Sequence, residues 1–126
     1  MRASNGLGMI AGCSTLILVL AAAAPAPTVL YGALAVDDAA GDQWGWAVDY
    51  PTQAEADLRA RLECGDDCSV VLRFTECGAY AGAGDGARGW AYGSDLGYVR
   101  TRALNECSRR TSEYCVIRAY GCNSRG

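Results

Sequence analysis

The chain carries an internal repeat, and this repeat limits its possible folds more than any other feature. Gly45-Trp46-Ala47 recurs as Gly89-Trp90-Ala91, and residues 60–64 match residues 103–107. The matching segments keep the same order, at offsets of 43 to 47 residues. Copies of one unit fold alike and pack against each other. We therefore expect a single duplicated domain at 30–122, with repeats at about 30–77 and 78–122 and a short tail at 123–126.

Each repeat is predicted to form two strands, a helix and a third strand. In the first repeat, alternating apolar residues predict strands at 31–36 and 44–50, and an apolar, β-branched run predicts a third at 69–74. The second of these strands is expected to place four side chains on one face: Trp44, Trp46, Val48 and Tyr50. The corresponding segments of the second repeat predict strands at 80–82, 88–92 and 116–120.

A helix is predicted between the second and third strands of each repeat. Thr52 and Glu55 have the spacing of a capping box, which marks a helix start, and Gly65 suits the left-handed position at a helix end. The second helix, at about 95–107, is expected to pack one face on the sheet through Val99, Ala103, Leu104 and Cys107. The fold class is therefore α+β, with two pseudo-symmetric strand-strand-helix-strand repeats.

Residues 1–26 have the layout of a secretory signal peptide. Arg2 is followed by a long apolar run and then by alanines at 21–24, so cleavage is expected near Ala24 or Ala26, with the small residues at 33–35 as an alternative. An uncleaved anchor stays open, because the run approaches the roughly 18–20 residues that cross a bilayer. A lipid anchor at Cys13 is disfavoured, since the apolar run lies after it. We expect a secreted or extracytoplasmic protein that leaves the membrane after cleavage.

Six cysteines remain once the signal peptide is removed. An even count in a short exported chain predicts disulfides. The repeat favours three bridges: a local Cys64–Cys68, its copy Cys107–Cys115, and Cys77–Cys122 between the repeats. A four-sulfur zinc site is the alternative. Zinc pairs favour two to four intervening residues, whereas seven separate Cys107 from Cys115. No metal and no cofactor is therefore expected.

Charge is unevenly distributed along the chain, and all eleven basic residues are arginine. Residues 30–77 hold ten acidic residues and three arginines, a net charge of −7, whereas residues 78–126 hold four and seven, a net charge of +3. Such asymmetry can draw the two halves together or form a polar surface. The acidic total makes the protein a poor candidate for binding nucleic acid.

The sequence contains no catalytic signature. It has no histidine, the commonest general base. The doublets Asp37-Asp38 and Asp66-Asp67 lie in predicted turns, where aspartate bonds nearby backbone. Residues 37–42 lack the alternating ligands and closing glutamate of a calcium loop. The glycine-rich residues 82–89 resemble a phosphate loop but join two strands, so we expect a hairpin turn there.

Aromatic and arginine side chains are the best candidates for a binding surface. Trp46 and Trp90 recur in the repeat, which favours a role in the core, whereas Arg88 takes the place of Trp44 in the second copy. Trp44 is therefore expected to be exposed. Tyrosine, tryptophan and arginine are enriched at the residues that dominate binding. The candidate surface comprises Trp44, Arg88, Tyr92, Arg100, Arg102, Arg109 and Arg110.

The cysteine, tryptophan and glycine positions together resemble a known family. They are Tyr31-Gly32-Ala33-Leu34-Ala35, Trp44-Gly45-Trp46, Cys64-Gly65, Cys68-Ser69-Val70-Val71, Cys77-Gly78-Ala79 and Cys122-Asn123. This pattern is similar to the domain-of-unknown-function family numbered 4189, over the whole mature chain. The resemblance implies a small exported bacterial protein with a duplicated α+β domain, and it implies no activity.

Three functions agree with these features. The leading hypothesis is a non-enzymatic exported module that binds a protein partner, as an effector or as an inhibitor of an extracytoplasmic enzyme. The second is a cell-envelope or glycan-binding protein that uses Trp44 and the aromatic rings around it. The third is a hydrolase built on aspartate and glutamate alone.

Overall fold

The computed structural model describes residues 28–38 and 43–124. Its elements are β1 (Tyr31–Asp37), β2 (Trp44–Tyr50), α2 (Gln53–Cys64), β3 (Cys68–Phe74), β4 (Cys77–Gly82), β5 (Arg88–Gly93), α3 (Leu96–Ser108) and β6 (Val116–Cys122). The predicted α+β class, with two strand-strand-helix-strand repeats, is confirmed. Strand β4 is longer than predicted, since it begins at Cys77. The predicted signal peptide at 1–26 lies outside the described residues.

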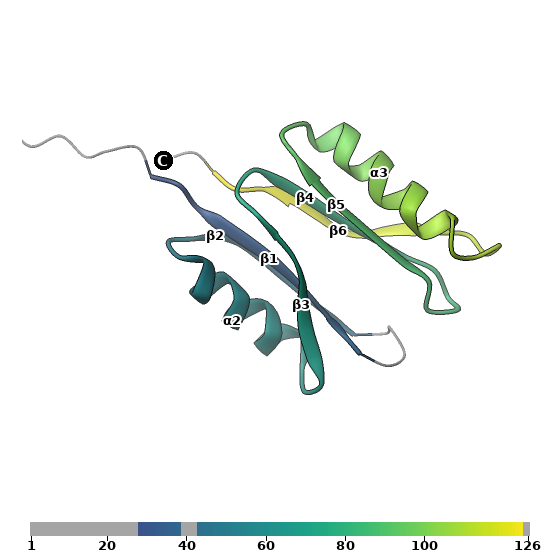
Figure 1. The fold of residues 1–126 in the computed structure, drawn as a ribbon, viewed down its shortest axis with the longest axis horizontal. Helices are drawn as coiled ribbons and strands as arrows, with labels where there is room; N and C mark the ends of the chain where they lie inside the picture. The colour runs from purple at the N-terminus through teal and green to yellow at the C-terminus, as the bar shows by residue number, and fades with distance from the viewer. Residues whose placement is uncertain (1–27, 39–42, 125–126) are drawn as a thin grey trace, which may run out of the picture.

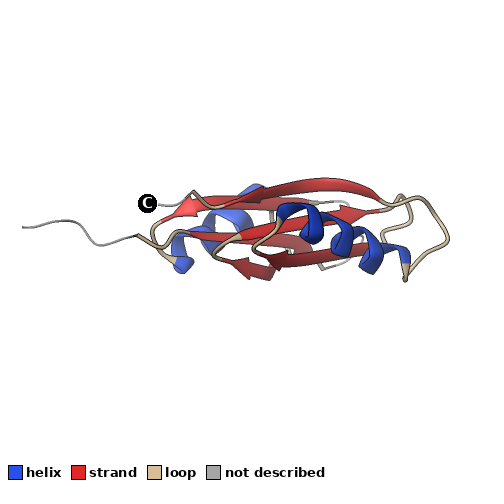
Figure 2. Cartoon of the chain, turned by 90° about the horizontal axis from the view of Figure 1, so that it is seen from above, coloured by secondary structure: helices blue, strands red, loops and turns tan. Residues whose placement is uncertain are grey.

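The two repeats form a sandwich of four layers. Each repeat makes one antiparallel sheet, in the orders β2-β1-β3 and β5-β4-β6. The sheets face each other, and each helix covers the outer face of its own sheet (Figure 1). Seen from above, the molecule is thin because each of its two sheets is only three strands wide (Figure 2).

Both helices begin at the residues that the sequence indicates. The Glu55 N–H donates to the Thr52 hydroxyl at 3.2 Å, which is the N-cap half of a capping box, and the Thr52 hydroxyl donates to the Glu55 carboxylate at 2.9 Å. The first helix ends at Gly65, whose φ is 112°. In the second helix the Asp95 carboxylate accepts from the Gly97 N–H at 3.0 Å. These caps satisfy backbone donors that a helix leaves free at its first turn.

The recurring glycine of each repeat lets the helix touch the second strand. A Cβ added at Gly45 would lie 1.9 Å from the Ala60 carbonyl oxygen, and one at Gly89 would lie 2.3 Å from the Ala103 carbonyl oxygen. Both contacts are with helix backbone, so nothing larger than glycine fits there without a shift. This close approach explains why Gly-Trp-Ala occurs twice.

A hydrophobic layer fills the space between the two sheets. Its buried members are Leu34, Val36, Leu72, Phe74, Tyr80 and Ala119, and its partly buried members include Trp44, Trp46 and Trp90. The Phe74 ring lies against Gly32 and Gly78, where an added Cβ would come within 2.5 and 2.8 Å. Trp46 and Trp90 therefore belong partly to the core, as their recurrence suggests.

A bulge in β2 corrects the predicted face of one side chain. Tyr31 pairs with Tyr50 and Ala33 with Ala47, so β2 has one residue more than β1 in this interval. Asp49 adopts the left-handed region there, with φ of 71°. An extra residue reverses the alternation of side chains. Tyr50 therefore packs on the α2 side, and only Trp44, Trp46 and Val48 lie between the sheets.

Three disulfides join the six cysteines of the described chain, in the pairs that the repeat predicts: Cys64–Cys68, Cys107–Cys115 and Cys77–Cys122. One expectation about them is wrong. Cys77–Cys122 does not join the two repeats, because Cys77 opens β4 and pairs with Cys122 of β6 within one sheet. Disulfides of this kind persist in oxidising, extracytoplasmic compartments. Within the described residues, no helix is long and apolar enough to cross a membrane.

Candidate functional site

Trp44 is not the exposed residue that the sequence predicts. It is half-buried, and its ring lies 6.0 Å from the ring of the fully buried Tyr80 on the opposite sheet. Trp44 therefore lies at a core position of the first repeat. Arg88 occupies the matching position of the second repeat, so this difference between the repeats changes the chemistry of the core and not of a surface.

Arg88 joins the two sheets. Its Nη1 donates to the Asp37 carbonyl at 2.8 Å and lies 3.7 Å from the Asp37 carboxylate, with both side chains mostly buried. Asp37 ends β1 and Arg88 begins β5, so this pair fixes one end of the sandwich. Arg88 is therefore engaged with its own chain, which corrects its assignment to a binding surface.

The four arginines of the α3 region do not form one surface. Arg100 lies over the ring of Tyr120 in β6, 4.7 Å from its centroid. Arg102 points toward the other side of the helix, where it lies 5.9 Å from the Tyr98 ring and lines a hollow beside β5. The remaining two arginines, Arg109 and Arg110, both pair with Glu106, at 3.1 and 3.6 Å. Of these four arginines, Arg102 is the one that lines the hollow beside β5, together with Trp90 and Tyr92.

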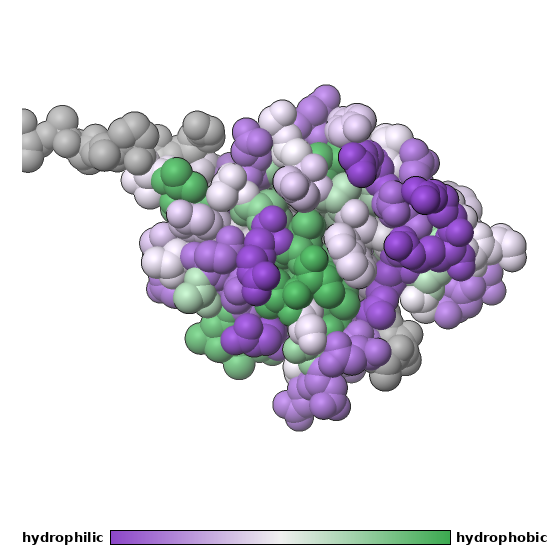
Figure 3. All heavy atoms as spheres, viewed as in Figure 1, coloured by the Kyte–Doolittle hydropathy of each residue, from purple (hydrophilic) through white to green (hydrophobic). Residues whose placement is uncertain are grey.

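That hollow lies where the open edges of β3 and β5 run beside each other. It measures about 480 Å³ and is lined by Val71, Leu72, Trp90, Ala91, Tyr92 and Arg102. The Tyr92 side chain is 66% exposed. Figure 3 shows hydrophobic residues gathered in the middle of this face, with hydrophilic residues on either side. We call this hollow the β3–β5 cleft.

A larger hollow of about 670 Å³ follows the outer surface of α3 and shares Arg102 with the cleft. It is lined mainly by polar and charged side chains, among them Asn105, Glu106 and Arg109. Glu106 and Arg109 are already paired with each other. The α3 hollow is lined by one aromatic residue, Tyr98, whereas the β3–β5 cleft is lined by two, Trp90 and Tyr92. Because aromatic side chains are enriched among the residues that dominate binding, we take the β3–β5 cleft as the candidate site despite its smaller volume.

The sequence identified two of the six lining residues, Tyr92 and Arg102, assigned Trp90 to the core, and missed the rest. Leu72 and Ala91 look like ordinary core residues in the sequence. Val71 reaches the inter-sheet side through a bulge, because the pairing of β1 with β3 shifts between Leu34 and Ala35. The equivalent shift in the second sheet falls at Arg118. No residue pattern in the sequence marks either shift.

A polar cluster surrounds Tyr80 at the end of the sandwich. Among the described residues, no group meets hydrogen-bond geometry with the Tyr80 hydroxyl, which is fully buried. Burial raises the pKa of this phenol above its ordinary value, and the positive charges of Arg88 and Arg118 oppose that rise. The phenol therefore stays neutral at physiological pH.

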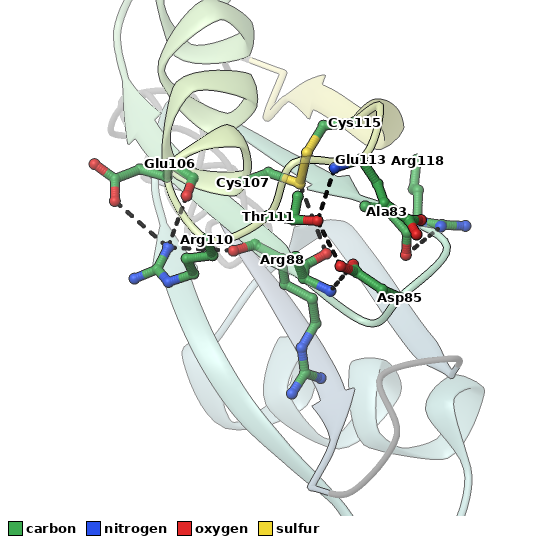
Figure 4. Close-up of a disulfide and its surroundings, with 11 residues drawn as sticks. Ala83, Asp85, Arg88, Glu106, Cys107, Arg110, Thr111, Glu113, Cys115 and Arg118 are labelled. Atoms are coloured by element: carbon green, nitrogen blue, oxygen red, sulfur yellow. Dashed lines mark hydrogen bonds and ion pairs between the residues drawn. A yellow bond between two sulfur atoms is a disulfide. The ribbon is translucent and has the colours of Figure 1, made fainter.

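The hairpin between β4 and β5 is tied to the loop after α3 (Figure 4). The Thr111 hydroxyl donates to the Asp85 carboxylate, and the Glu113 N–H donates to the Thr111 hydroxyl at 2.9 Å. The first of these bonds, followed by one from the Ala87 N–H, holds the pKa of Asp85 below its ordinary value of 3.8. The predicted hairpin turn is present, with Gly86 at φ of 92°. This loop is therefore structural, not a phosphate cradle.

The first acidic doublet is bonded to side chains far away in the sequence, and not only to nearby backbone as the sequence predicts. Asp37 binds Arg88, Asp38 accepts from the Ser69 hydroxyl at 3.0 Å, and Asp67 has a left-handed φ of 63° in the turn before β3. Across residues 28–38 and 43–124, no group of three or more histidine, cysteine, aspartate or glutamate side chains is arranged to hold a metal ion. Nothing in this part of the chain indicates catalysis.

Known proteins with a similar sequence have no described activity in their names. Three mycobacterial proteins are each 40% identical over 78 residues: Protein Mb1300c of Mycobacterium bovis, and Protein MT1307 and Protein Rv1269c of Mycobacterium tuberculosis. The match covers 61% of this chain and 60% of each relative, so the chain spans less than two thirds of their length. No solved structure matches significantly. The family model "Domain of unknown function (DUF4189)" matches residues 31–122, so the chain belongs to that family.

Proposed function

We propose that this protein is an exported, non-enzymatic module that binds a protein partner through the β3–β5 cleft. The observation that carries the proposal is the combination of a two-thirds exposed Tyr92, the half-buried Trp90 and the cation of Arg102 around one cleft. Such residues supply most of the binding energy in protein interfaces. The three disulfides support the proposal because a rigid surface loses less entropy when it binds.

Photo-crosslinking from within the cleft tests this proposal. Tyr92 is replaced by the photoreactive residue benzoylphenylalanine, and cells that export the protein are irradiated. The control carries the same residue in place of Tyr114, which is 84% exposed and lies in the loop before β6. We expect a discrete protein adduct from position 92 that is absent from position 114. Equal adducts from both positions, or none from position 92, would contradict the proposal.

The two other hypotheses have less support. The glycan-binding hypothesis relied on an exposed Trp44, whose half-buried ring instead packs at an angle against the Tyr80 ring. The hydrolase hypothesis needs two carboxylates facing one cleft, and the β3–β5 cleft is lined by none.

A further inference from the structure

We propose that the open edge of β5 binds an extended segment of the partner as an added strand. The segment is one in which apolar side chains alternate with acidic ones. This inference rests on the proposed function, and it names the kind of partner segment that the β3–β5 cleft accepts. Addition of a strand to an exposed sheet edge is an established mode of peptide recognition.

Alternate residues of β5 direct their backbone N–H and C=O groups away from β4, toward the open edge of the sheet. The Ala83 N–H donates to the Ala87 carbonyl at 2.9 Å, so β4 and β5 exchange hydrogen bonds at that pair. Residues of an antiparallel pair alternate between facing the partner strand and facing away. Given the register of β4 with β5, Arg88, Trp90 and Tyr92 direct their N–H and C=O groups away from β4.

Two of these residues keep free backbone groups at the edge. The Arg88 carbonyl accepts from Arg110 Nη1 at 3.2 Å (Figure 4). No group of the described residues bonds the N–H or C=O of Trp90 or Tyr92 on that side. An unpaired strand edge of this kind is a template for another strand.

The corresponding edge of the first repeat, at β2, has side-chain partners for two of its N–H groups. Asp37 N–H donates to Gln43 carbonyl at 3.1 Å, so Trp46 faces away from β1 as Trp90 faces away from β4. The Trp46 N–H donates to the Glu63 carboxylate at 3.5 Å, and the Asp49 N–H donates to the Asn123 side chain at 2.7 Å. Two N–H groups on the edge of β2 are therefore bonded by side chains, one from α2 and one from the residue after β6.

The second repeat has the matching glutamate but uses it differently. Glu106 stands 43 residues after Glu63, in the matching segment of the repeat. Its carboxylate pairs with Arg109 and Arg110 instead of reaching the Trp90 N–H. The two copies thus differ at the recurring tryptophan: the Trp46 N–H has a side-chain partner, and the Trp90 N–H has none among the described residues.

A strand added to β5 would contact different side chains on its two faces. Its successive side chains would point to opposite faces of the sheet. On the inner face they would meet the side chains of Trp90, Tyr92 and Val71 in the cleft. On the outer face they would meet α3, where Arg102 borders the cleft. Alternating apolar and acidic side chains match both surfaces.

The test uses an acetylated and amidated nonapeptide of alternating valine and glutamate. We titrate it into the ¹⁵N-labelled, disulfide-bonded protein and follow the amide signals by NMR. We expect the largest shifts at Trp90 and Tyr92 and none at Trp46. A nonapeptide of the same composition without the alternation, and one N-methylated at alternate residues, should bind at least about tenfold more weakly, because they lose the side-chain pattern or the backbone donors.

Two charge reversals on one helix separate strand addition from general attraction. Arg102→Glu should weaken binding of the alternating peptide by about five- to tenfold. Arg100→Glu makes the same change in charge but lies over Tyr120, away from the cleft, and should leave binding within about twofold.

Strand addition is overturned if the alternating peptide does not bind, if the N-methylated peptide binds equally well, or if both reversals have the same effect. A partner that still crosslinks from position 92 in any of those cases would leave the proposed function standing without the added strand. Loss of that crosslink together with failure of the peptide would overturn both.

Discussion

Several side chains in this protein bond to residues that lie far away in the sequence. Arg88 holds Asp37 of the other sheet, and Asn123 bonds Asp49, 74 residues earlier. Asp85 holds Thr111 across two loops. Each of these pairs connects a loop or a strand end to another part of the fold. Substituting one member of a pair therefore measures how much that connection contributes.

The Asp85 carboxyl reports on the tie between the β4–β5 hairpin and the loop after α3. Because its folded pKa is depressed, the tie contributes above the unfolded pKa and is lost as the pH falls through the folded value. We expect Thr111→Val to raise the pKa of Asp85 toward its ordinary 3.8, since the Thr111 hydroxyl is the largest cause of the shift. An NMR titration of the Asp85 carboxyl measures this. An unchanged pKa would mean that the hydroxyl does not bind it.

Replacing Tyr80 with phenylalanine tests whether the buried Tyr80 hydroxyl lacks a hydrogen bond. Removing an unsatisfied buried polar group recovers the free energy lost when it left water. Tyr80→Phe should therefore leave the free energy of unfolding unchanged or raise it by up to about 1 kcal/mol. Tyr120→Phe, at a half-exposed site, is the control and should have no effect. Urea unfolding measures both, and destabilisation by more than about 1 kcal/mol at Tyr80 would show that the hydroxyl is bonded.

At the scale of elements, the close contact between helix and strand depends on one glycine in each repeat. A methyl group at Gly89 would lie 2.3 Å from the Ala103 carbonyl oxygen and from the Cys107 nitrogen. Gly89→Ala should cost about 3 kcal/mol of stability, because helix backbone has to move. Gly84→Ala is the matched control: its Cβ would come no closer than 3.4 Å to a flexible side chain, and it should change stability by less than about 0.5 kcal/mol. Equal costs would show that α3 is not packed on Gly89.

Elements with strong local signals could be predicted from the sequence. Thr52 with Glu55 marked the helix start, Gly65 its end, and Asp85-Gly86 the hairpin. The repeat indicated which cysteines pair, because symmetry reduced the possible connectivities.

The candidate site could be predicted only in part. Tyr92 and Arg102 do line the cleft, but Trp44 and Arg88 were assigned to a surface when they lie at the junction of the two sheets. Bulges decide which way Tyr50 and Val71 point, and they depend on strand pairing that local sequence does not encode. Tertiary packing thus determines the parts that were missed.

At the scale of the whole molecule, the disulfide within the second sheet should contribute the most stability. Cys77–Cys122 closes a loop of 45 residues, whereas Cys64–Cys68 closes one of 4. Loop-closure entropy predicts a loss of about 4 kcal/mol for the double variant Cys77→Ser with Cys122→Ser, and about 2 kcal/mol for Cys64→Ser with Cys68→Ser. Denaturant unfolding of both double variants measures the difference, and a larger loss for the short loop would contradict it.

The two repeats have equivalent sheet edges, at β2 and β5, whose backbone N–H groups differ in their hydrogen bonding. Glu63 and Asn123 bond the N–H groups of Trp46 and Asp49 at the edge of β2. At the edge of β5, the N–H groups of Trp90 and Tyr92 have no partner among the described residues and lie beside an aromatic cleft. The proposed binding function depends on this difference. A covered edge would leave Trp90 and Tyr92 without backbone groups to offer a partner.

Amide hydrogen exchange of the free protein, followed residue by residue by NMR, tests this claim most directly. The account predicts slow exchange for the N–H groups of Trp46 and Asp49, which side chains bond, and exchange at least about tenfold faster for those of Trp90 and Tyr92. Equal protection at Trp46 and Trp90 would mean that the β5 edge is covered too, and the account would be wrong.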